Sequence, residues 1–164
     1  MVFPFEDDYS FGILQSEAHW RWFVQRCSTM KGDFRYTSNT VFHTFPWPQA
    51  PSAKAVRAVA EASVALRTLR NQLRAKHGLS LRDLYRAIEK PGSHPLVAAQ
   101  DTLDAAVRAA YGFTPRQEVL KALAELNAAC AAREARGEPI TAPGFPRPAA
   151  ERAAFVSDDC IRTP

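Results

Sequence analysis

The spacing of apolar positions separates an aromatic first third of the chain from a helical remainder. In residues 1–14, alternating Phe residues, an acidic cluster and a short apolar run predict an extended segment. Ser16 then precedes apolar positions three or four residues apart, which predicts an N-capped helix with one buried stripe. That stripe comprises Trp20, Phe23, Val24, Cys27 and Met30. Residues 34–45 are mostly β-branched and aromatic and predict one or two strands.

Helical periodicity begins at Ser52, and Gly78 and Gly112 are expected to end two of the helices. Five apolar positions with 3-4-3-4 spacing form a seam: Val59, Ala62, Leu66, Leu69 and Leu73. Such a seam is typical of a helix that packs against a partner helix. A capping box at Ser80 and Asp83 predicts a short helix. An apolar stripe over residues 96–111 predicts another helix, and the cap and Pro within residues 114–117 predict the start of the last one.

These elements predict an α-rich α+β fold. A small aromatic, β-containing head comprises residues 1–49, and a bundle of about four helices comprises residues 50–137. Residues 138–164 hold five of the twelve Pro residues and show little periodicity. This composition is typical of an irregular tail that lies along the body or is partly disordered.

Size and charge narrow the class of protein. A chain of 164 residues is long enough for one domain with a core. No run approaches the roughly 20 apolar residues that span a bilayer, and no basic segment opens a signal peptide, so we expect a cytoplasmic protein.

The basic residues are concentrated in the helical part, since residues 53–137 hold fourteen Lys and Arg against eight Asp and Glu. Sixteen of the 21 basic residues are Arg, which favours phosphate or guanine contacts or reflects a GC-rich genome.

The sequence indicates neither a metal site nor a catalytic residue. Cys27, Cys130 and Cys160 lie far apart and show no zinc-ligand spacing with the four His residues, so we expect reduced thiols. The chain contains no Gly-x-Gly, P-loop or nucleophile-elbow motif. Paired acids near the termini are typical of solvated positions.

Three motifs in order carry a resemblance to a known family. They are F-G-I-L-Q-S-x-x-H-x-x-W over residues 11–22, K-G-D-F-R-Y-T over 31–37 and V-F-H-T-F-P-W-P over 41–48. Together they resemble the end of the target-recognition domain in MmeI-like, S-adenosyl-methionine-dependent DNA methyltransferases, including type IIL and IIG restriction–modification enzymes. We assign eight matching positions to the structural motif: Ser16, His19, Trp22, Asp33, Phe45, Pro46, Trp47 and Pro48.

The resemblance extends over roughly residues 2–132. Ser80–Tyr85 is similar to a short family helix with the pattern S-L-x-D-L-Y, and Leu103–Gly112 to a helix of the L-D-x-A-V-x-x-A-Y-G type. The resemblance implies that residues 1–49 are the C-terminal end of a DNA target-recognition domain and residues 50–137 a C-terminal helical domain.

The resemblance also implies an activity for the parent enzyme, which is methyl transfer from S-adenosyl-methionine to an adenine amino group in duplex DNA. The family's catalytic Asn-Pro-Pro-Tyr/Phe motif is missing here, because the chain contains no Pro-Pro pair. We therefore expect no cofactor in this chain and no catalysis by this chain alone. The expected partners are duplex DNA and a methyltransferase catalytic domain or subunit encoded upstream, in a prokaryotic cytoplasm and with no membrane.

The resemblance and the basic pattern give six candidate DNA contacts: Lys31, Arg35, Tyr36, Arg67, Arg70 and Arg74. Lys31 and Arg35 lie between a predicted helix and strand and are expected to reach phosphate or a guanine edge. The alternative is that Asp33 pairs with Arg35 while Tyr36 packs. The three Arg residues beside the seam either follow phosphates or form a solvated face.

Two classes of function follow from these features. The leading hypothesis is the DNA target-recognition and helical portion of a site-specific adenine methyltransferase, in restriction–modification or phage defence. The alternative is a stand-alone α-helical protein-interaction module that uses the Leu seam, or a truncated remnant of the methyltransferase gene.

Overall fold

The structure is a computed structural model, and it describes residues 3–30, 33–89 and 93–160. Its α-helices are α1 (Asp8–Gln15), α2 (Glu17–Arg26), α3 (Ala53–His77), α4 (Leu81–Ile88), α5 (Pro95–Tyr111) and α6 (Val119–Ala135). Strands β1 (Ser28–Met30) and β2 (Asp33–Arg35) form an antiparallel pair. A π-helical turn, η1 (Ser38–Phe42), and a 3-10 helix, η2 (Ala149–Phe155), complete the elements. The predicted α-rich fold is confirmed.

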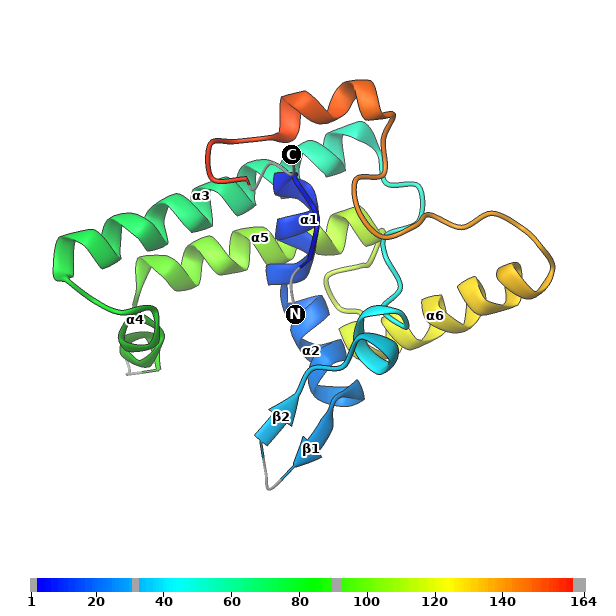
Figure 1. Cartoon of the computed structure of the whole chain (residues 1–164), viewed down its shortest axis with the longest axis horizontal. Coiled ribbons are helices and arrows are strands. Elements are labelled where there is room, and N and C mark those ends of the chain that lie inside the picture. Colours follow the sequence, from blue (N-terminus) through cyan, green and yellow to red (C-terminus); the bar gives the residue numbers. More distant parts are fainter. Residues whose placement is uncertain (1–2, 31–32, 90–92, 161–164) are drawn as a thin grey trace.

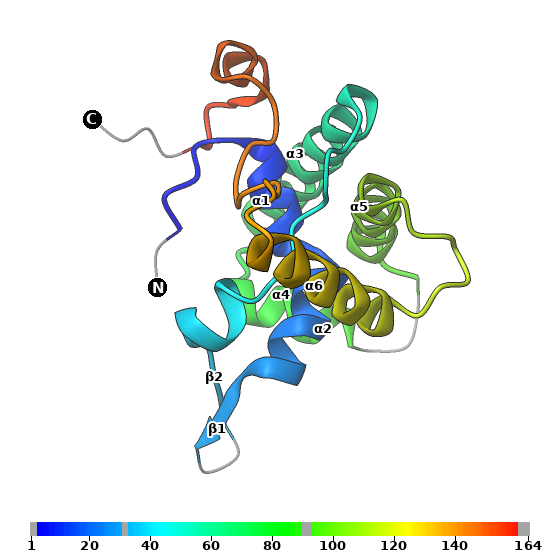
Figure 2. The same cartoon turned by 90° about the vertical axis from the view of Figure 1, so that its right-hand side faces the viewer.

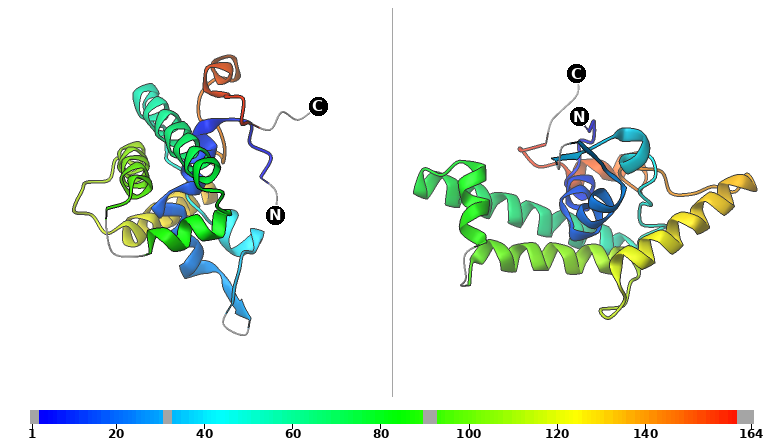
Figure 3. Two further views of the ribbon diagram at one scale, coloured as in Figure 1. Left: turned by 90° about the vertical axis from the view of Figure 1, so that its left-hand side faces the viewer. Right: turned by 90° about the horizontal axis from the view of Figure 1, so that it is seen from below.

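Helices α3 and α5 lie side by side and antiparallel, and α1 crosses them (Figures 1 and 3). The crossing of α1 over α3 is close because Gly12 has no side chain. A Cβ on Gly12 would lie 2.8 Å from Val59 Cγ1 and 3.1 Å from Ser63 Cβ. Of the predicted seam of α3, Val59, Ala62 and Leu66 are buried and Leu69 and Leu73 are half-buried, and α3 packs against α1 and α5.

Helix α2 continues from α1 at Ser16 and packs against α5 and α6. The β1–β2 hairpin follows α2 and extends from the body beyond the helices (Figures 1 and 2). The C-terminal segment with η2 lies on the opposite side, against α3 (Figure 1). The hairpin and the C-terminal segment therefore occupy opposite ends of the molecule.

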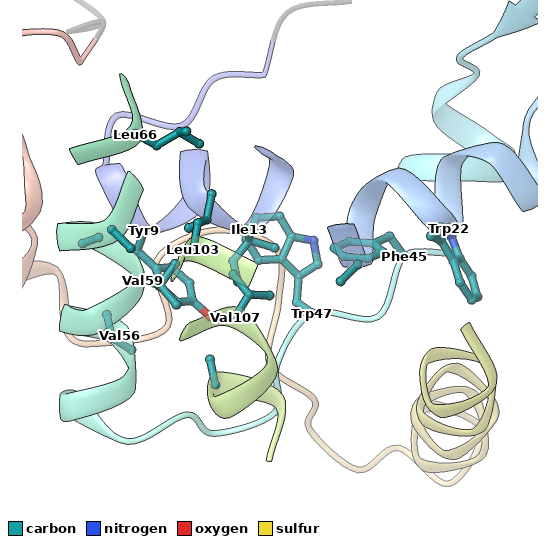
Figure 4. Close-up of a cluster of buried hydrophobic side chains, with 14 of the residues drawn as sticks. Tyr9, Ile13, Trp22, Phe45, Trp47, Val56, Val59, Leu66, Leu103 and Val107 are labelled. Atoms are coloured by element: carbon teal, nitrogen blue, oxygen red, sulfur yellow. The ribbon is translucent and has the colours of Figure 1, made fainter. Parts of the chain in front are cut away.

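One core joins the first 49 residues to the later helices. Figure 4 shows Tyr9 and Ile13 of α1 beside Val59 of α3 and Leu103 and Val107 of α5. All five side chains are fully or almost fully buried. Because their apolar surface is removed from water only when the segments pack together, the head and the helices stabilise each other.

Two predictions for the first third are wrong. Residues 8–15 are helical and not extended, because Asp7 caps α1 by accepting a hydrogen bond from the Ser10 backbone N–H at 2.7 Å. Helix α2 ends at Arg26 and buries Ala18, His19 and Trp22 instead of the predicted stripe. Trp20, a member of that stripe, is 57% exposed.

The predicted strands over residues 34–45 are also wrong for most of their length. Only Asp33–Arg35 pairs, and Ser38–Phe42 forms the π-helical turn. Val41 is the buried residue of that turn. The β-branched and aromatic residues of this segment therefore reflect packing against neighbouring side chains and not an extended backbone.

Several helix boundaries match the sequence signals. Ser52 caps α3, and Gly78 ends it in the left-handed conformation. Ser80 caps α4 by accepting from the Asp83 backbone N–H, and Gly112 ends α5. The last helix begins at Val119 and not within residues 114–117, because the Glu118 carboxylate caps it.

The C-terminal segment is irregular, as predicted, but its described part packs on the body. The Thr141 backbone N–H donates to Gln49 Oε1 at 2.9 Å. Phe145 and Phe155 pack against each other, with ring centroids 5.0 Å apart, and join the core. The Phe145 ring is half-buried and the Phe155 ring is buried.

Candidate nucleic-acid interface

The β1–β2 hairpin presents a row of exposed side chains. Asp33, Phe34 and Arg35 are all exposed, and Arg35 lies opposite Ser28 in the ladder. Lys31, the other candidate base or phosphate contact in this region, lies outside the described residues. The hairpin therefore carries a cation at its base and projects into solvent (Figure 2).

Arg35 has no ion-pair partner among residues 3–30, 33–89 and 93–160. The same is true of Asp33 within these ranges, so the local Asp33–Arg35 pair of the alternative interpretation does not form. An unpaired guanidinium keeps all five of its N–H donors available for a ligand.

Aromatic rings support the hairpin from the side of α2. Phe34 lies edge-on to Trp20 and Phe23, with ring centroids 6.5 and 5.9 Å apart respectively. Trp20 is 57% exposed and Phe34 53% exposed. The apolar spacing predicted that Trp20 is buried, so this surface was not predicted. Residues two apart on a helix do not share a face, and a buried face through Ala18 and Trp22 therefore leaves Trp20 on the exposed side of α2.

Tyr36 fixes the chain where it leaves β2. Its ring stacks on Phe23 at 5.3 Å, and its hydroxyl lies 3.0 Å from His19 Nε2. His19 Nδ1 lies 3.0 Å from the carbonyl oxygen of Leu14, which can only accept, so Nδ1 carries the proton and Nε2 accepts from Tyr36. Tyr36, a predicted DNA contact, thus positions the segment that leaves β2 in this structure.

Burial sets the protonation state of this pair. Removal of the imidazole from water lowers the pKa of His19 to about 4, against an opposing hydrogen bond to Leu14. Burial also raises the pKa of Tyr36 to about 12. Both groups are therefore neutral at pH 7, which is the state that the hydrogen bond between them requires.

The F-P-W-P segment is a buried turn between the head and the helices. Phe45, Pro46, Trp47 and Pro48 are all buried. The hydroxyl of Tyr111 on α5 donates to the Pro46 carbonyl at 2.8 Å. These four residues thus have a packing role, and they fix the direction in which the chain enters α3.

Two further hydrogen bonds hold the head on the helices. The Glu17 backbone N–H donates to Asp104 of α5 at 2.6 Å, so a carboxylate from the helical part satisfies the first turn of α2. The side chain of Asn127 on α6 donates to the Thr44 carbonyl at 2.7 Å. Ser16 accepts from the His19 backbone N–H and caps α2 from within the head.

Arg67, a predicted phosphate contact, is a buried ion-pair residue in the structure. Its Nη2 donates to Asp8 Oδ1 at 2.8 Å, and its Nε donates to Asp159 Oδ2 at 2.9 Å. The residue is 7% exposed, and its guanidinium also lies over the Phe11 ring. The donors of Arg67 are thus turned to carboxylates of α1 and the C-terminal segment.

The other two candidates on α3 differ from Arg67. Arg70 is half-buried, and its Nε is buried without a hydrogen-bond partner in the described part of the chain. Arg74 is exposed, and its Nε lies 3.4 Å from the Leu79 carbonyl beyond the end of α3. Arg74 is therefore the most accessible of the three.

An open, mostly aromatic cavity of about 690 Å³ lies between the N-terminal segment and α2. Its lining includes Phe3, Phe5, Phe11, Trp20, Phe23 and Tyr36. Within residues 3–30, 33–89 and 93–160 there is no cluster of metal-ligating side chains and no helix long and apolar enough to cross a membrane. The three cysteines are free thiols.

Known proteins share both the sequence and the fold of this chain. Residues 1–49 match the family model described as MmeI, target recognition domain. DNA methyltransferase A of Bacillus subtilis (strain 168) is 31% identical over 123 residues, which cover 72% of this chain and 13% of that protein. The type IIL restriction-modification enzyme MmeI, solved in complex with DNA, matches with a TM-score of 0.66 and 29% identity over 77% of this chain and 16% of its own.

The chain thus spans less than a fifth of the length of either relative. The family match covers the hairpin, its aromatic support and the F-P-W-P turn, and the longer matches continue into the helices. Residues 1–49 thus carry MmeI target-recognition-domain sequence, and the chain as a whole is similar to a part of a DNA methyltransferase and of a type IIL restriction-modification enzyme.

Proposed function

We propose that this chain is the DNA-contacting target-recognition and helical portion of a site-specific adenine DNA methyltransferase. One observation carries the DNA contact: Arg35 lies exposed on a projecting hairpin with no ion-pair partner among the described residues. The solved relative MmeI, which is in complex with DNA, supports the choice of ligand.

The shape of the hairpin suits a DNA groove. The major groove of B-DNA admits a two-stranded β-ribbon, and Arg is the side chain that most often reads guanine there. Arg35 lies at the base of such a ribbon, opposite Ser28, and Lys31 stands between its two strands in the sequence. In this proposal they reach a guanine edge or phosphate, while the His19–Tyr36 hydrogen bond and the F-P-W-P turn hold the ribbon in place.

The residues described here do not fit S-adenosyl-methionine. In doubly wound folds a glycine-rich turn from a strand into a helix holds nucleotide cofactors. Strand β2 leads into η1 through Tyr36 and Thr37, without glycine. We propose that the methyl-transfer chemistry belongs to a catalytic domain or subunit that works with this chain.

The alternative of a protein-interaction module loses its main support. Its basis was the Leu seam of α3, and Val59 and Leu66 of that seam are buried against α1 and α5 within the chain. Leu69 and Leu73 are half-buried, so only the C-terminal half of the seam keeps apolar surface for a partner helix.

Duplex binding across a salt series tests the proposal. The full chain is titrated with a labelled duplex at salt concentrations from about 50 to 200 mM. Because each neutralised phosphate releases counterions, the logarithm of the affinity should fall linearly with the logarithm of the salt concentration. Absence of binding at the lowest salt, or an affinity that does not respond to salt, would contradict DNA contact by this chain.

A further inference from the structure

The junction of α3 and α4 forms a basic tip, which we define as Arg74, Lys76, Arg82 and Arg86. All four side chains are exposed. None of them makes an ion pair with another residue that the structure describes. Most cations of α5, α6 and the C-terminal segment, in contrast, form an ion pair with a glutamate. They are Arg108, Arg133, Arg136 and Arg147.

The exposed face of α4 carries two cations. Arg82 and Arg86 are four residues apart, so their like charges lie on one face and repel each other. Arg82 also lies in the first turn, where the positive end of the helix dipole disfavours a cation, whereas Asp83 in the first turn and Arg86 in the last are favourably placed. An anion at this face would offset both costs.

The rest of α4 fixes this face toward solvent. Leu84 is its buried residue and anchors the helix on the body. Tyr85, between the two Arg residues in sequence, is 40% exposed. Aromatic and polar side chains beside Arg commonly contact the sugar–phosphate backbone.

The tip and the hairpin lie on the same side of the molecule. In Figures 1 and 2 both α4 and the hairpin lie beyond the α3–α5 layer, on the side away from the C-terminal segment. A ligand that approaches the hairpin from this side therefore meets α4 as well.

We propose that the basic tip is a second contact surface for the phosphate backbone of the same duplex that the hairpin reads. The proposal rests on the proposed function, because the duplex is the ligand in both. The hairpin would supply base or nearby phosphate contacts, and the tip sequence-independent ones that set the orientation of the chain on DNA.

The test compares two double variants of the full chain. R82Q/R86Q removes two charges from the tip, and K54Q/R152Q removes two exposed charges from the start of α3 and from η2, at the other end of α3 and on the opposite side. At about 0.9 in slope per phosphate, the tip variant should lose about tenfold less affinity than the wild type between roughly 50 and 200 mM salt. Its preference among duplex sequences should stay unchanged.

The outcomes separate this inference from the proposed function. If the wild type binds DNA and R82Q/R86Q retains the salt slope of K54Q/R152Q, the tip does not contact phosphate and the inference is wrong. If the wild type binds no duplex, the proposed function fails and the inference fails with it. If R82Q/R86Q binds DNA like the control but loses a self-association seen by light scattering, the tip is a protein contact and the inference is overturned. Thermal unfolding midpoints of both variants check that folding is intact.

Discussion

The hydroxyl of Tyr36 lies 3.0 Å from Nε2 of His19, and this hydrogen bond joins the end of the hairpin to α2. The imidazole is buried and also holds the Leu14 carbonyl at the end of α1. One neutral side chain thus fixes the relative positions of α1, α2 and the segment that leaves β2. The orientation of the proposed DNA-reading surface depends on the protonation state of His19.

The first prediction concerns pH. The pKa of His19 is about 4 in the folded chain and 6.5 when solvated, so between these values protons bind the unfolded state preferentially. The His19 contribution to stability is therefore complete above pH 6.5 and is lost as the pH falls toward 4, by about 3 kcal/mol in total. His19→Gln should flatten the pH dependence of the unfolding free energy over this window. Urea titrations of both proteins at several pH values measure the difference, and parallel pH profiles would contradict it.

The second prediction concerns the buried ion pair between α3 and α1. Arg67→Met leaves the Asp8 carboxylate buried without its cation, which should cost about 3–5 kcal/mol of unfolding free energy. Asp159→Asn should cost less than about 1 kcal/mol, because the Asp159 side chain is 51% exposed.

The double variant Asp8→Asn/Arg67→Met provides the control, since it removes the uncompensated charge. It should recover part of the loss, and denaturant unfolding of the four proteins gives the comparison. A loss in Arg67→Met no larger than that in Asp159→Asn would show that the pair is not the buried contact described here.

The third prediction concerns the close crossing of α1 and α3. Gly12→Ala adds a Cβ that would lie 2.8 Å from Val59 Cγ1. Ala favours a helix over Gly by about 1 kcal/mol, but overpacking costs about 1–3 kcal/mol, so we expect a net loss of about 1 kcal/mol. Val59→Ala removes this closest contact and leaves Ser63 Cβ at 3.1 Å from the added Cβ, so in that background the loss should be smaller. An equal change in unfolding free energy in both backgrounds would show that Gly12 and Val59 are not in contact where α1 crosses α3.

Helix ends were the features most readily predicted from the sequence. Ser52, Gly78, Ser80 and Gly112 mark ends by local chemistry, since a hydroxyl caps a first turn and glycine adopts the left-handed conformation. The seam of α3 was also predicted, because helical periodicity persists for many turns. These signals lie within a few residues of the features that they determine.

Long-range contacts decided the features that were missed. Arg67 looks like a surface cation by its position beside the seam, and only the fold brings Asp8 and Asp159 to it. Trp20 shares the spacing of a buried stripe, but α6 and α5 cover the other face of α2. The absence of an ion pair at Arg35 likewise depends on the direction in which the hairpin projects. From the sequence, a pair between Arg35 and Asp33 was equally consistent.

The most direct test of whether the hairpin reads DNA is the base preference of an Arg35→Ala variant. The full chain and the variant are titrated with a panel of duplexes that differ at single positions, with Arg152→Ala on the opposite side as a matched control. If Arg35 reads a base, the variant should lose discrimination at one position by about 1–3 kcal/mol, and the control should keep it. Uniform weakening over all duplexes would assign Arg35 to phosphate. Binding by Arg35→Ala that equals the wild type on every duplex would contradict a DNA-reading hairpin.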